Sequence, residues 1–240
     1  MLVLETDKNQ AGSLINYGKA CVQWGDDSLV QLLINKLDDL DDSPVFVDVG
    51  GCLGVFTIGL SEKIEEKGGK TFCFEPQRIL HNCICGSIAL NGLARTYCLN
   101  KAVGNPAVAG TKIKVPKFDY SQTCNFGSVE FGGEQREPLE QQRDYSSEDE
   151  TIDLVSLDSY IDEFGKVDLI KIDVEGMEMD VLRGATQILE TFHPTVLIEW
   201  IKSDKEKMVD FFKELGYKTV TESKDIPTCH ALSGEFLCEH

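Results

Sequence analysis

Three carboxylates in this sequence stand where short apolar segments end, and a fourth follows closely. Asp48, Glu75 and Asp173 each lie at the end of such a segment, and Glu175 lies two residues beyond Asp173. A carboxylate can accept hydrogen bonds from hydroxyl groups, balance a cation or take up a proton during a reaction. Lys171 would share its side of a strand with Asp173, because successive side chains alternate between the two faces. We therefore expect ligand binding or catalysis at Asp173, and a purely structural Lys171–Asp173 ion pair is the alternative.

A glycine-rich loop follows the first apolar segment and leads into a predicted helix. It comprises Gly50, Gly51, Cys52 and Gly54. Glycines let a ligand approach the backbone closely, and the first turn of a helix offers free N–H groups. The Gly-x-Gly-x-x-Gly spacing of dinucleotide sites is not met, because Cys52 and Val55 occupy its second and third glycine positions. We expect this loop to bind a ligand, and a plain turn between a strand and a helix is the alternative.

Glu75, which is followed by Pro76, could accept two hydrogen bonds from the diol of a ribose. An acidic residue with this role occurs in dinucleotide sites as well as in adenosyl sites, so a structural role for Glu75 stays open. Asp48 stands two residues before Gly50, and its charge favours a cationic or hydroxyl-rich ligand over a pyrophosphate.

Seven short apolar segments predict the strands that position these residues. The first five alternate with amphipathic helical stretches, which is typical of βαβ units and a parallel sheet. The connection between the last two is too short for a crossover helix, so we expect the last strand to run antiparallel. The predicted fold class is α/β, with a doubly wound, mostly parallel sheet whose ligands bind beyond the carboxyl ends of the strands. The strands are expected at residues 44–49, 71–74, 95–103, 167–174, 195–200, 217–221 and 235–238.

The chain is expected to consist of an N-terminal helical extension, residues 1–43, and one domain over residues 44–240. In the extension, apolar residues spaced three and four apart over Leu29–Leu40 predict an amphipathic helix. Asp27 or Ser28 could cap the start of this helix.

The alternation of strands and helices breaks over residues 105–150, approximately, and we call this stretch the insertion. Residues 134–153 hold eight acidic residues and two arginines, and only residues 112–115 look like a strand. A structureless loop of this length is uncommon in a compact domain unless it is functional or disordered. We expect a partly ordered insertion, with a hairpin and a mobile acidic stretch.

Composition limits the partners and the compartment. The 240 residues include 23 Lys and Arg and 41 Asp and Glu, for a formal net charge of −18. A field of this sign repels phosphates and anionic lipids, so we expect neither nucleic acid nor a membrane as partner. No apolar stretch approaches the ~20 residues of a membrane helix. Nine cysteines, several within apolar runs, and an opening without a signal-peptide pattern lead us to expect a reduced, cytoplasmic setting.

Two groupings of histidine and cysteine raise the question of a metal site. His81, Cys83 and Cys85 are spaced two apart on a predicted helix, where residues i and i+2 face apart. Cys229 and His230 are adjacent in the chain. Neither grouping has the spacing of a metal site, so we predict no metal.

Together these segments resemble the FkbM-type S-adenosylmethionine-dependent methyltransferases. The resemblance runs from about residue 45 to about residue 200. It rests most of all on the stretch DLIKIDVEG at 168–176, which is followed by VLRGA at 181–185. It implies a Rossmann-like, seven-stranded methyltransferase sheet with an antiparallel last strand, and it implies S-adenosylmethionine as the cofactor.

The resemblance also implies roles for the residues at the strand ends. Asp48 and the glycine loop would shape the methionine end of the cofactor pocket, Glu75 would hold the ribose hydroxyls, and Ala102 would flank the adenine. Asp173 would stand near the transferred methyl group. The expected cofactor-binding set is Asp48, Gly50, Gly51, Cys52, Gly54, Glu75, Pro76, Ala102 and Asp173. The loop departs from the family, which usually has Gly-Ala-Asn there, because Cys52 lacks the amide of the asparagine.

Members of the family are usually O-methyltransferases that act on hydroxyls of sugars and secondary metabolites, so a small molecule of this kind is the expected acceptor. We hypothesise that Asp173 or Glu175 accepts the hydroxyl proton while Lys171 steers the local charge. His193 is a second candidate base, because histidine titrates near neutrality. A plain turn between a helix and a strand is the alternative for His193-Pro194.

The acceptor is expected to dock against the insertion, where Tyr120, Asn125 and Phe126 offer aromatic and amide groups. A structural hairpin is the alternative for this segment. Three other functions stay open: a cofactor-binding protein that has lost catalysis, a protein-interaction module that uses the acidic loop, and a nicotinamide oxidoreductase. The spacing of the glycines argues against the last of these.

Overall fold

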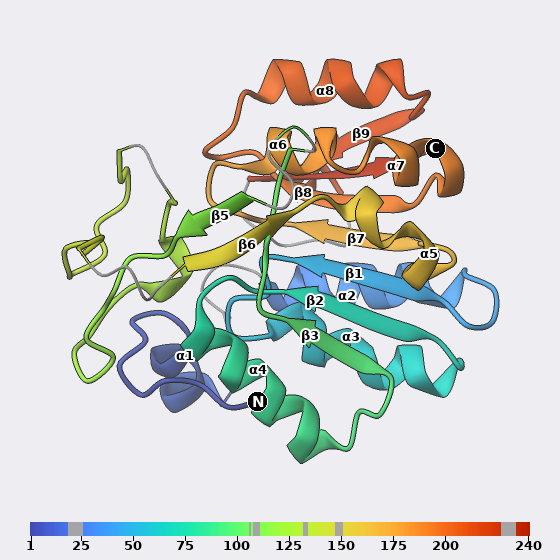
Figure 1. Cartoon of the computed structure of the whole chain (residues 1–240). Coiled ribbons are helices and arrows are strands. Elements are labelled where there is room, and N and C mark those ends of the chain that lie inside the picture. The colour runs from blue at the N-terminus through green and yellow to red at the C-terminus, as the bar shows by residue number, and fades with distance from the viewer. Residues whose placement is uncertain (19–25, 106, 108–110, 132–133, 147–150, 227–233) are drawn as a thin grey trace.

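The centre of the molecule is a seven-stranded sheet with the strand order β3-β2-β1-β7-β8-β10-β9 (Figure 1). The computed structural model describes residues 1–18, 26–105, 107, 111–131, 134–146, 151–226 and 234–240. The sheet strands are β1 (Val45–Val49), β2 (Lys70–Phe74), β3 (Thr96–Leu99), β7 (Leu169–Ile172), β8 (Thr195–Glu199), β9 (Thr219–Glu222) and β10 (Glu235–Glu239).

Strand directions agree with the prediction for an α/β, mostly parallel sheet. β1 pairs in parallel with β2 and β7, and the pairs β2–β3 and β7–β8 are also parallel. β10 runs antiparallel to both of its neighbours, β8 and β9, which confirms the reversed last strand. The chain builds outward from β1 to one side and from β7 to the other, so the strand order reverses between them. Ligands of doubly wound sheets bind at such a reversal.

Helices cover both faces of the sheet because the strands are apolar on both sides. Val45, Val47 and Val49 of β1 pack into a core with one group of helices, whereas Phe46 packs with the other group. The group around Phe46 is α2 (Asp26–Asp38), α3 (Val55–Glu66) and α4 (Arg78–Asn91). The opposite group is α5 (Ile161–Phe164), α6 (Glu178–Arg183), α7 (Thr186–Phe192) and α8 (Lys205–Glu214).

The N-terminal extension contributes directly to this core. Leu33 and Leu37 of α2 are fully buried against α3 and the sheet, as the predicted apolar stripe requires. The described part of α2 begins at Asp26, ahead of both predicted caps. A second helix, α1 (Gln10–Tyr17), precedes it. The domain boundary at residue 44 stays a prediction.

In the described part of the chain, no helix has both the length and the apolar character to cross a membrane.

The predicted third strand, residues 95–103, is wrong in its second half. The chain leaves the main sheet after Leu99, and the Asn100 side chain donates to the carbonyl oxygens of Glu75 and Pro76 at 2.9 and 3.0 Å. A separate three-stranded sheet of order β4-β6-β5 then forms. Its strands are β4 (Ala102–Val103), β5 (Thr111–Lys114) and β6 (Thr151–Val155).

The insertion is anchored at both ends by this second sheet. β5 matches the predicted strand at 112–115 and pairs antiparallel with β6, which the sequence analysis did not predict. The predicted acidic stretch lies partly at residues 147–150, outside the described residues. Between these strands the chain lies beside the N-terminal segment, and Asp7 pairs with Cys124 (Figure 1). Short 3₁₀ helices, η3 (Phe126–Ser128), η4 (Leu157–Tyr160) and η5 (Ser223–Asp225), complete the fold.

Candidate functional site

A pocket with about 560 Å³ of empty space, open solvent at its mouth included, lies beyond the carboxyl ends of β1, β2 and β7. This is the point where the strand order reverses. The pocket brings most of the predicted site residues together. Those that line it are Gly50, Cys52, Glu75, Pro76, Ala102, Asp173 and Glu175. The predicted residues that do not line it are Asp48, Gly51, Gly54 and Lys171.

Gly50 brings the loops after β1 and β7 into contact. It has a positive φ of 85°, and its N–H donates to the carbonyl oxygen of Phe74 at 2.9 Å. A Cβ atom at this position would lie 1.8 Å from the carbonyl oxygen of Asp173. No side chain fits into that space, because the opposing atom belongs to the backbone. Gly50 thus holds Asp173 at the wall of the pocket.

Gly50→Ala is expected to destabilise the fold by about 3 to 5 kcal/mol, because it adds a backbone clash to the cost of a positive φ. Gly92→Ala is the matched control: its φ is 65°, and a Cβ atom there meets nothing within 4 Å. The control should lose only about 1 to 2 kcal/mol. Urea unfolding of both variants measures the difference, and equal losses would contradict the close approach at Gly50.

The remainder of the glycine loop packs behind the pocket wall. A Cβ atom on Gly51 would lie 2.2 Å from the Sγ atom of Cys73, so the loop lies directly on β2. Gly54 precedes the first residue of α3. Cys52 has a φ of 49°, which turns its N–H toward Glu75. The loop therefore presents backbone to the pocket on one side and excludes side chains on the other.

Glu75 is 3% exposed, and both of its carboxylate oxygens accept backbone hydrogen bonds. The N–H of Cys52 donates to Oε2 at 2.8 Å, and that of Gln77 donates to Oε1 at 2.7 Å. Burial nevertheless raises the pKa of Glu75 to about 8, because desolvation outweighs these two bonds. The pocket holds a carboxyl group that titrates near neutral pH.

Glu75 is expected to make the stability of the protein depend on pH. Its pKa rises from 4.5 to about 8 on folding, so between these values the native state binds more protons than the unfolded state. The contribution is fully present below pH 4.5 and is lost as the pH rises through 8, by roughly 1.4 kcal/mol per pH unit within that window.

Urea unfolding at pH 5 and at pH 8 tests this dependence against Glu75→Gln, which cannot titrate. The fall in the free energy of unfolding should be steeper in the wild type than in the variant. The other carboxyl groups with a raised pKa are present in both proteins. If the free energy of unfolding falls equally in both, the pH dependence comes from residues other than Glu75.

Lys171 lies beneath the pocket and contacts residues of the loops after β1 and β7. Its Nζ donates to the carbonyl oxygen of Gly50 at 2.8 Å and lies 3.3 Å from Asp173 and 3.8 Å from Asp48. Burial lowers the pKa of Lys171, but the two carboxylates overcome this effect and raise it above its ordinary value. Asp48 also accepts from Thr57 Oγ1 at 2.6 Å, and burial raises its pKa. The predicted Lys171–Asp173 ion pair is therefore present, within a buried cluster of three charges.

Lys171→Met is expected to destabilise the protein by about 3 to 5 kcal/mol, because it leaves Asp48 buried without a counter-charge. Asp48 is fully buried, so its charge cannot be solvated in place. The double variant Lys171→Met with Asp48→Asn removes that charge and should recover part of the loss. Denaturant unfolding of the single and double variants measures both effects, and a double variant no more stable than Lys171→Met would contradict this origin.

The loop that carries Asp173 and Glu175 is fixed by residues that the sequence analysis gave no role. Glu178 accepts from the N–H groups of Val174 and Gly176 at 3.1 and 3.0 Å. Glu175, with a φ of 56°, forms an ion pair with the buried Lys202. The side chain of Asp173 is 36% exposed, and its Oδ1 atom has no hydrogen-bond partner.

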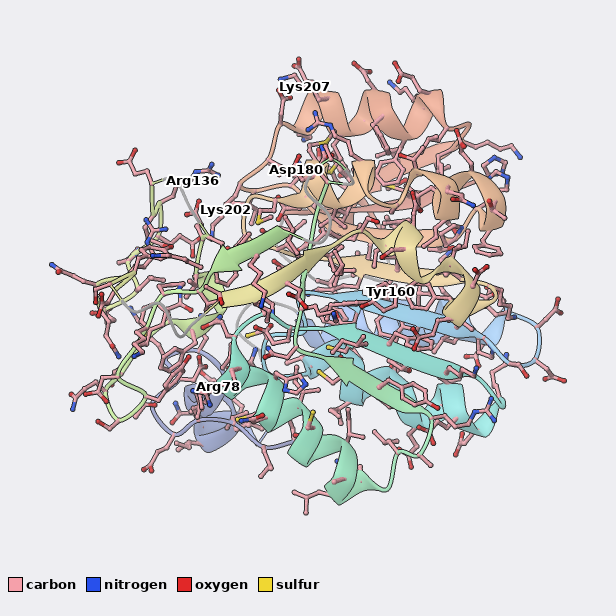
Figure 2. The ribbon with its side chains drawn as sticks, in the orientation of Figure 1. Arg78, Arg136, Tyr160, Asp180, Lys202 and Lys207 are labelled. Atoms are coloured by element: carbon pink, nitrogen blue, oxygen red, sulfur yellow. The ribbon has the colours of Figure 1, made fainter. Side chains whose placement is uncertain are left out.

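Lys202 connects this loop to the insertion. Its backbone carbonyl oxygen accepts from Nη1 of Arg136 at 2.5 Å, and Figure 2 shows the two residues side by side. Arg136 is held in turn by Glu130, whose carboxylate accepts from the Arg136 N–H at 2.8 Å. No local pattern could have found the contact between Lys202 and Arg136, because the two residues lie 66 positions apart in the chain.

Acidic side chains cluster around the loop after β7, beside the pocket. Burial first, and then the carboxylates of Asp173 and Glu178, raise the pKa of Glu199 at the end of β8 to about 10. Burial and Asp173 also raise the pKa of Glu175 to about 8, although Lys202 opposes the shift. Each carboxylate raises the pKa of its acidic neighbours, and a cation bound nearby would lower these pKa values again. The site thus favours a positively charged group.

The insertion forms the remaining wall, but not through the residues predicted for it. Gly127, Val129 and Phe131 line the pocket, and Gln77 Nε2 donates to the carbonyl oxygen of Phe126 at 2.8 Å. The expectation that Tyr120, Asn125 and Phe126 face an acceptor is not met, because none of them lines the pocket.

Packing explains where these three residues lie instead. Phe126 is fully buried and stacks on Tyr120 with ring centroids 5.0 Å apart. Asn125 accepts from Asn9 and donates to Ser128, at 3.0 and 2.8 Å. The aromatic and amide groups thus tie the insertion to the N-terminal segment.

His193 is excluded as a base by its position. It is the C-cap of α7, with a φ of 48°, and lies two residues before β8 begins. Its ring stacks on that of His240, with ring centroids 3.7 Å apart. The amino end of β8 lies at the edge of the sheet opposite the pocket. The alternative of a plain turn at His193-Pro194 is therefore the correct one.

Comparison with known proteins gives the site its context. The family model of the methyltransferase FkbM domain matches residues 48–219. The methyltransferase sdnD from Sordaria araneosa is 25% identical over 203 residues, which cover 70% of this chain and 74% of that protein.

The fold also occurs in a solved structure. The methyltransferase FkbM from Methylobacillus flagellatus KT matches with a TM-score of 0.53 at 18% identity, and the match covers 82% of this chain but only 44% of that one. An rRNA methylase from Streptococcus thermophilus matches with a TM-score of 0.48 at 13% identity, over 87% of this chain and 93% of that one. Because the family model spans well over half of its residues, this chain belongs to the FkbM family of S-adenosylmethionine-dependent methyltransferases.

Proposed function

We propose that this chain transfers a methyl group from S-adenosylmethionine to a hydroxyl oxygen of a small molecule, a sugar or a secondary metabolite. The observation that carries the proposal is the carboxylate of Asp173, which stands at the pocket with Oδ1 unpartnered and Oδ2 near Lys171. A hydroxyl group becomes a nucleophile when a positioned base removes its proton. Asp173 lines the pocket, and its side chain is 36% exposed although the Oδ1 atom itself is buried.

The residues present fit the cofactor. Glu75 offers a buried carboxyl group for the ribose hydroxyls, while Pro76 and Ala102 offer apolar surface for the adenine. Gly50 lines the pocket beside Asp173, so its backbone could contact the methionine part, and the carboxylate of Asp173 suits a sulfonium cation. S-adenosylmethionine supplies an activated methyl group when bound, so the protein has to provide only alignment and a base.

Asp173 is the better of the two predicted bases. Glu175 Oε2 is already bound by Lys202, so its lone pairs are less available to an acceptor hydroxyl than those of Asp173. Lys171 does not line the pocket, so it acts as a positioning residue that holds the side chain of Asp173 through Oδ2. The proton of the acceptor would pass to the carboxylate of Asp173.

A neutral or cationic small molecule fits this site better than a polyanion. The formal net charge is −18, so phosphate-rich acceptors are repelled. Phe131 and Met177 add apolar surface for a hydrocarbon skeleton. Both features support a hydroxylated metabolite as the acceptor and argue against nucleic acid.

A labelled-methyl assay tests the proposal. The chain is incubated with methyl-labelled S-adenosylmethionine and a panel of saccharides, polyols and RNA, while calorimetry measures binding of S-adenosylmethionine and of NAD. Label in a base-stable ether of a saccharide or polyol is the expected result. Label in RNA would overturn the acceptor class. Cofactor binding without transfer would favour a protein that has lost catalysis, and binding of NAD alone would favour an oxidoreductase.

A further inference from the structure

Three metal-ligating side chains that the proposed methyl transfer does not use meet between α4 and β3. They are His81 and Cys85 of α4 and Cys98 of β3. One ligand atom from each lies within 4.8 Å of the other two. The Sγ atom of Cys85 is 3.4 Å from Nε2 of His81, and none of the three residues lines the pocket.

The fold brings these residues together from two elements. His81 and Cys85 are four residues apart, so they share one face of α4. That face packs on β3, where Cys98 is paired in register with the buried Cys73. The prediction that His81, Cys83 and Cys85 bind no metal used only their spacing along the chain. Cys83 does belong elsewhere, since it packs against the core around Leu80, but Cys98 takes the place of a third ligand.

The separation of Cys85 Sγ and His81 Nε2 suits a tetrahedral metal ion. Zinc lies about 2.3 Å from sulfur and 2.0–2.1 Å from nitrogen, so two such ligands on one ion are roughly 3.5 Å apart. The 3.4 Å between Cys85 and His81 matches this value without any movement of the backbone. Nδ1 of His81 lies 3.4 Å from Oδ1 of Asn82, which can accept a hydrogen bond from Nδ1–H and so leave the lone pair of Nε2 free to bind.

We propose that His81, Cys85 and Cys98 form a binding site for one thiophilic metal ion of the Zn²⁺ type, through one imidazole nitrogen and two thiolates. The three side chains are partly exposed, so water can take the fourth position. In the metal-free chain Nε2 lies 3.2 Å from the carbonyl oxygen of Cys98, so binding replaces that contact with a bond to the ion. The site is separate from the cofactor pocket and does not depend on the proposed methyl transfer.

Binding has a definite proton balance. The ordinary pKa of a cysteine thiol is about 8.5, so cysteines that bind no metal mostly carry their protons at neutral pH. The ion forms two metal–sulfur bonds, and the two thiol protons leave to solvent. No oxidation or reduction takes place.

Titration of the full chain with Co²⁺, under a phosphine reductant that keeps thiols reduced, tests the site. Co²⁺ reports thiolate ligands by a sulfur-to-metal charge-transfer band and tetrahedral geometry by strong visible bands. We expect one ion per chain, both sets of bands, displacement by Zn²⁺ and release of two protons per ion. Absence of the charge-transfer band at saturation would overturn the proposal.

Single substitutions assign the ligands. Cys85→Ser and His81→Gln alter half-buried positions on α4 and should each weaken Co²⁺ binding by more than about tenfold. Cys98→Ser should also remove one of the two proton releases. Cys83→Ser, on the same helix but outside the cluster, is the matched control and should bind as the wild type does. Equal loss in Cys83→Ser, or full binding in His81→Gln and Cys98→Ser, would contradict the assignment.

Discussion

Asp173→Asn is expected to lower kcat for methyl transfer by about 10²- to 10⁴-fold, the range that a positioned general base contributes. The substitution keeps the shape of the side chain but removes its ability to take up a proton. It leaves Glu75 and the glycine loop intact, so the Kd for S-adenosylmethionine should stay within about tenfold, a change of 1.4 kcal/mol. Rapid-quench assays give the first quantity and calorimetry the second.

A matched control for this prediction is Asp180→Asn. Asp180 lies on α6 near the same loop, but its side chain is 44% exposed and paired with Arg183. Its substitution should leave both kcat and Kd unchanged. If Asp173→Asn retains full turnover, Asp173 is not the base. If it loses cofactor binding and turnover in the same proportion, its role lies in binding alone.

Glu75→Ala is expected to weaken the binding of S-adenosylmethionine by about 100-fold or more. Glu75 would accept both ribose hydroxyls, and above its pKa of about 8 it is charged, so that each hydrogen bond contributes about 1.5 to 3 kcal/mol; the binding is therefore measured at pH 9. Glu75→Gln keeps one acceptor oxygen and should fall between the wild type and the alanine variant. Calorimetry with S-adenosylmethionine measures the series.

The control for Glu75 has to separate binding from folding, since this carboxylate also accepts two backbone N–H groups. Each variant is therefore compared at a temperature where its circular dichroism matches that of the wild type. Glu140→Ala removes an exposed carboxylate from the insertion and should leave the Kd unchanged. A folded Glu75→Ala protein with wild-type affinity would contradict the assignment of the ribose to this residue.

The main sheet could be predicted from the sequence because its strands are short, apolar on both faces and separated by helical stripes. The run from Val45 to Val49 is buried along its whole length, as such a run requires. The reversal of β10 followed from the length of one connection alone. The gathering of Glu75 and Asp173 at one pocket then followed from topology, since both stand at carboxyl ends of the two parallel strands that flank β1.

The walls of the pocket could not be predicted, because they depend on contacts between distant residues. β6 is short and continues an acidic stretch, so its alternation of buried and exposed residues gave too weak a signal. Phe126 looked like a ligand contact, yet an aromatic side chain in an insertion is equally suited to a local core. Lys202 and Cys98 lie in stretches without any local motif, and only the fold brings them to Glu175 and His81.

A crystal structure of the chain with S-adenosylhomocysteine tests directly whether the pocket beyond β1, β2 and β7 binds the cofactor. We expect the ligand to fill this pocket, with its ribose hydroxyls on Glu75 and its sulfur facing Asp173. Full-occupancy ligand bound anywhere else, or a pocket that stays closed by its own side chains at saturating ligand, would contradict this expectation.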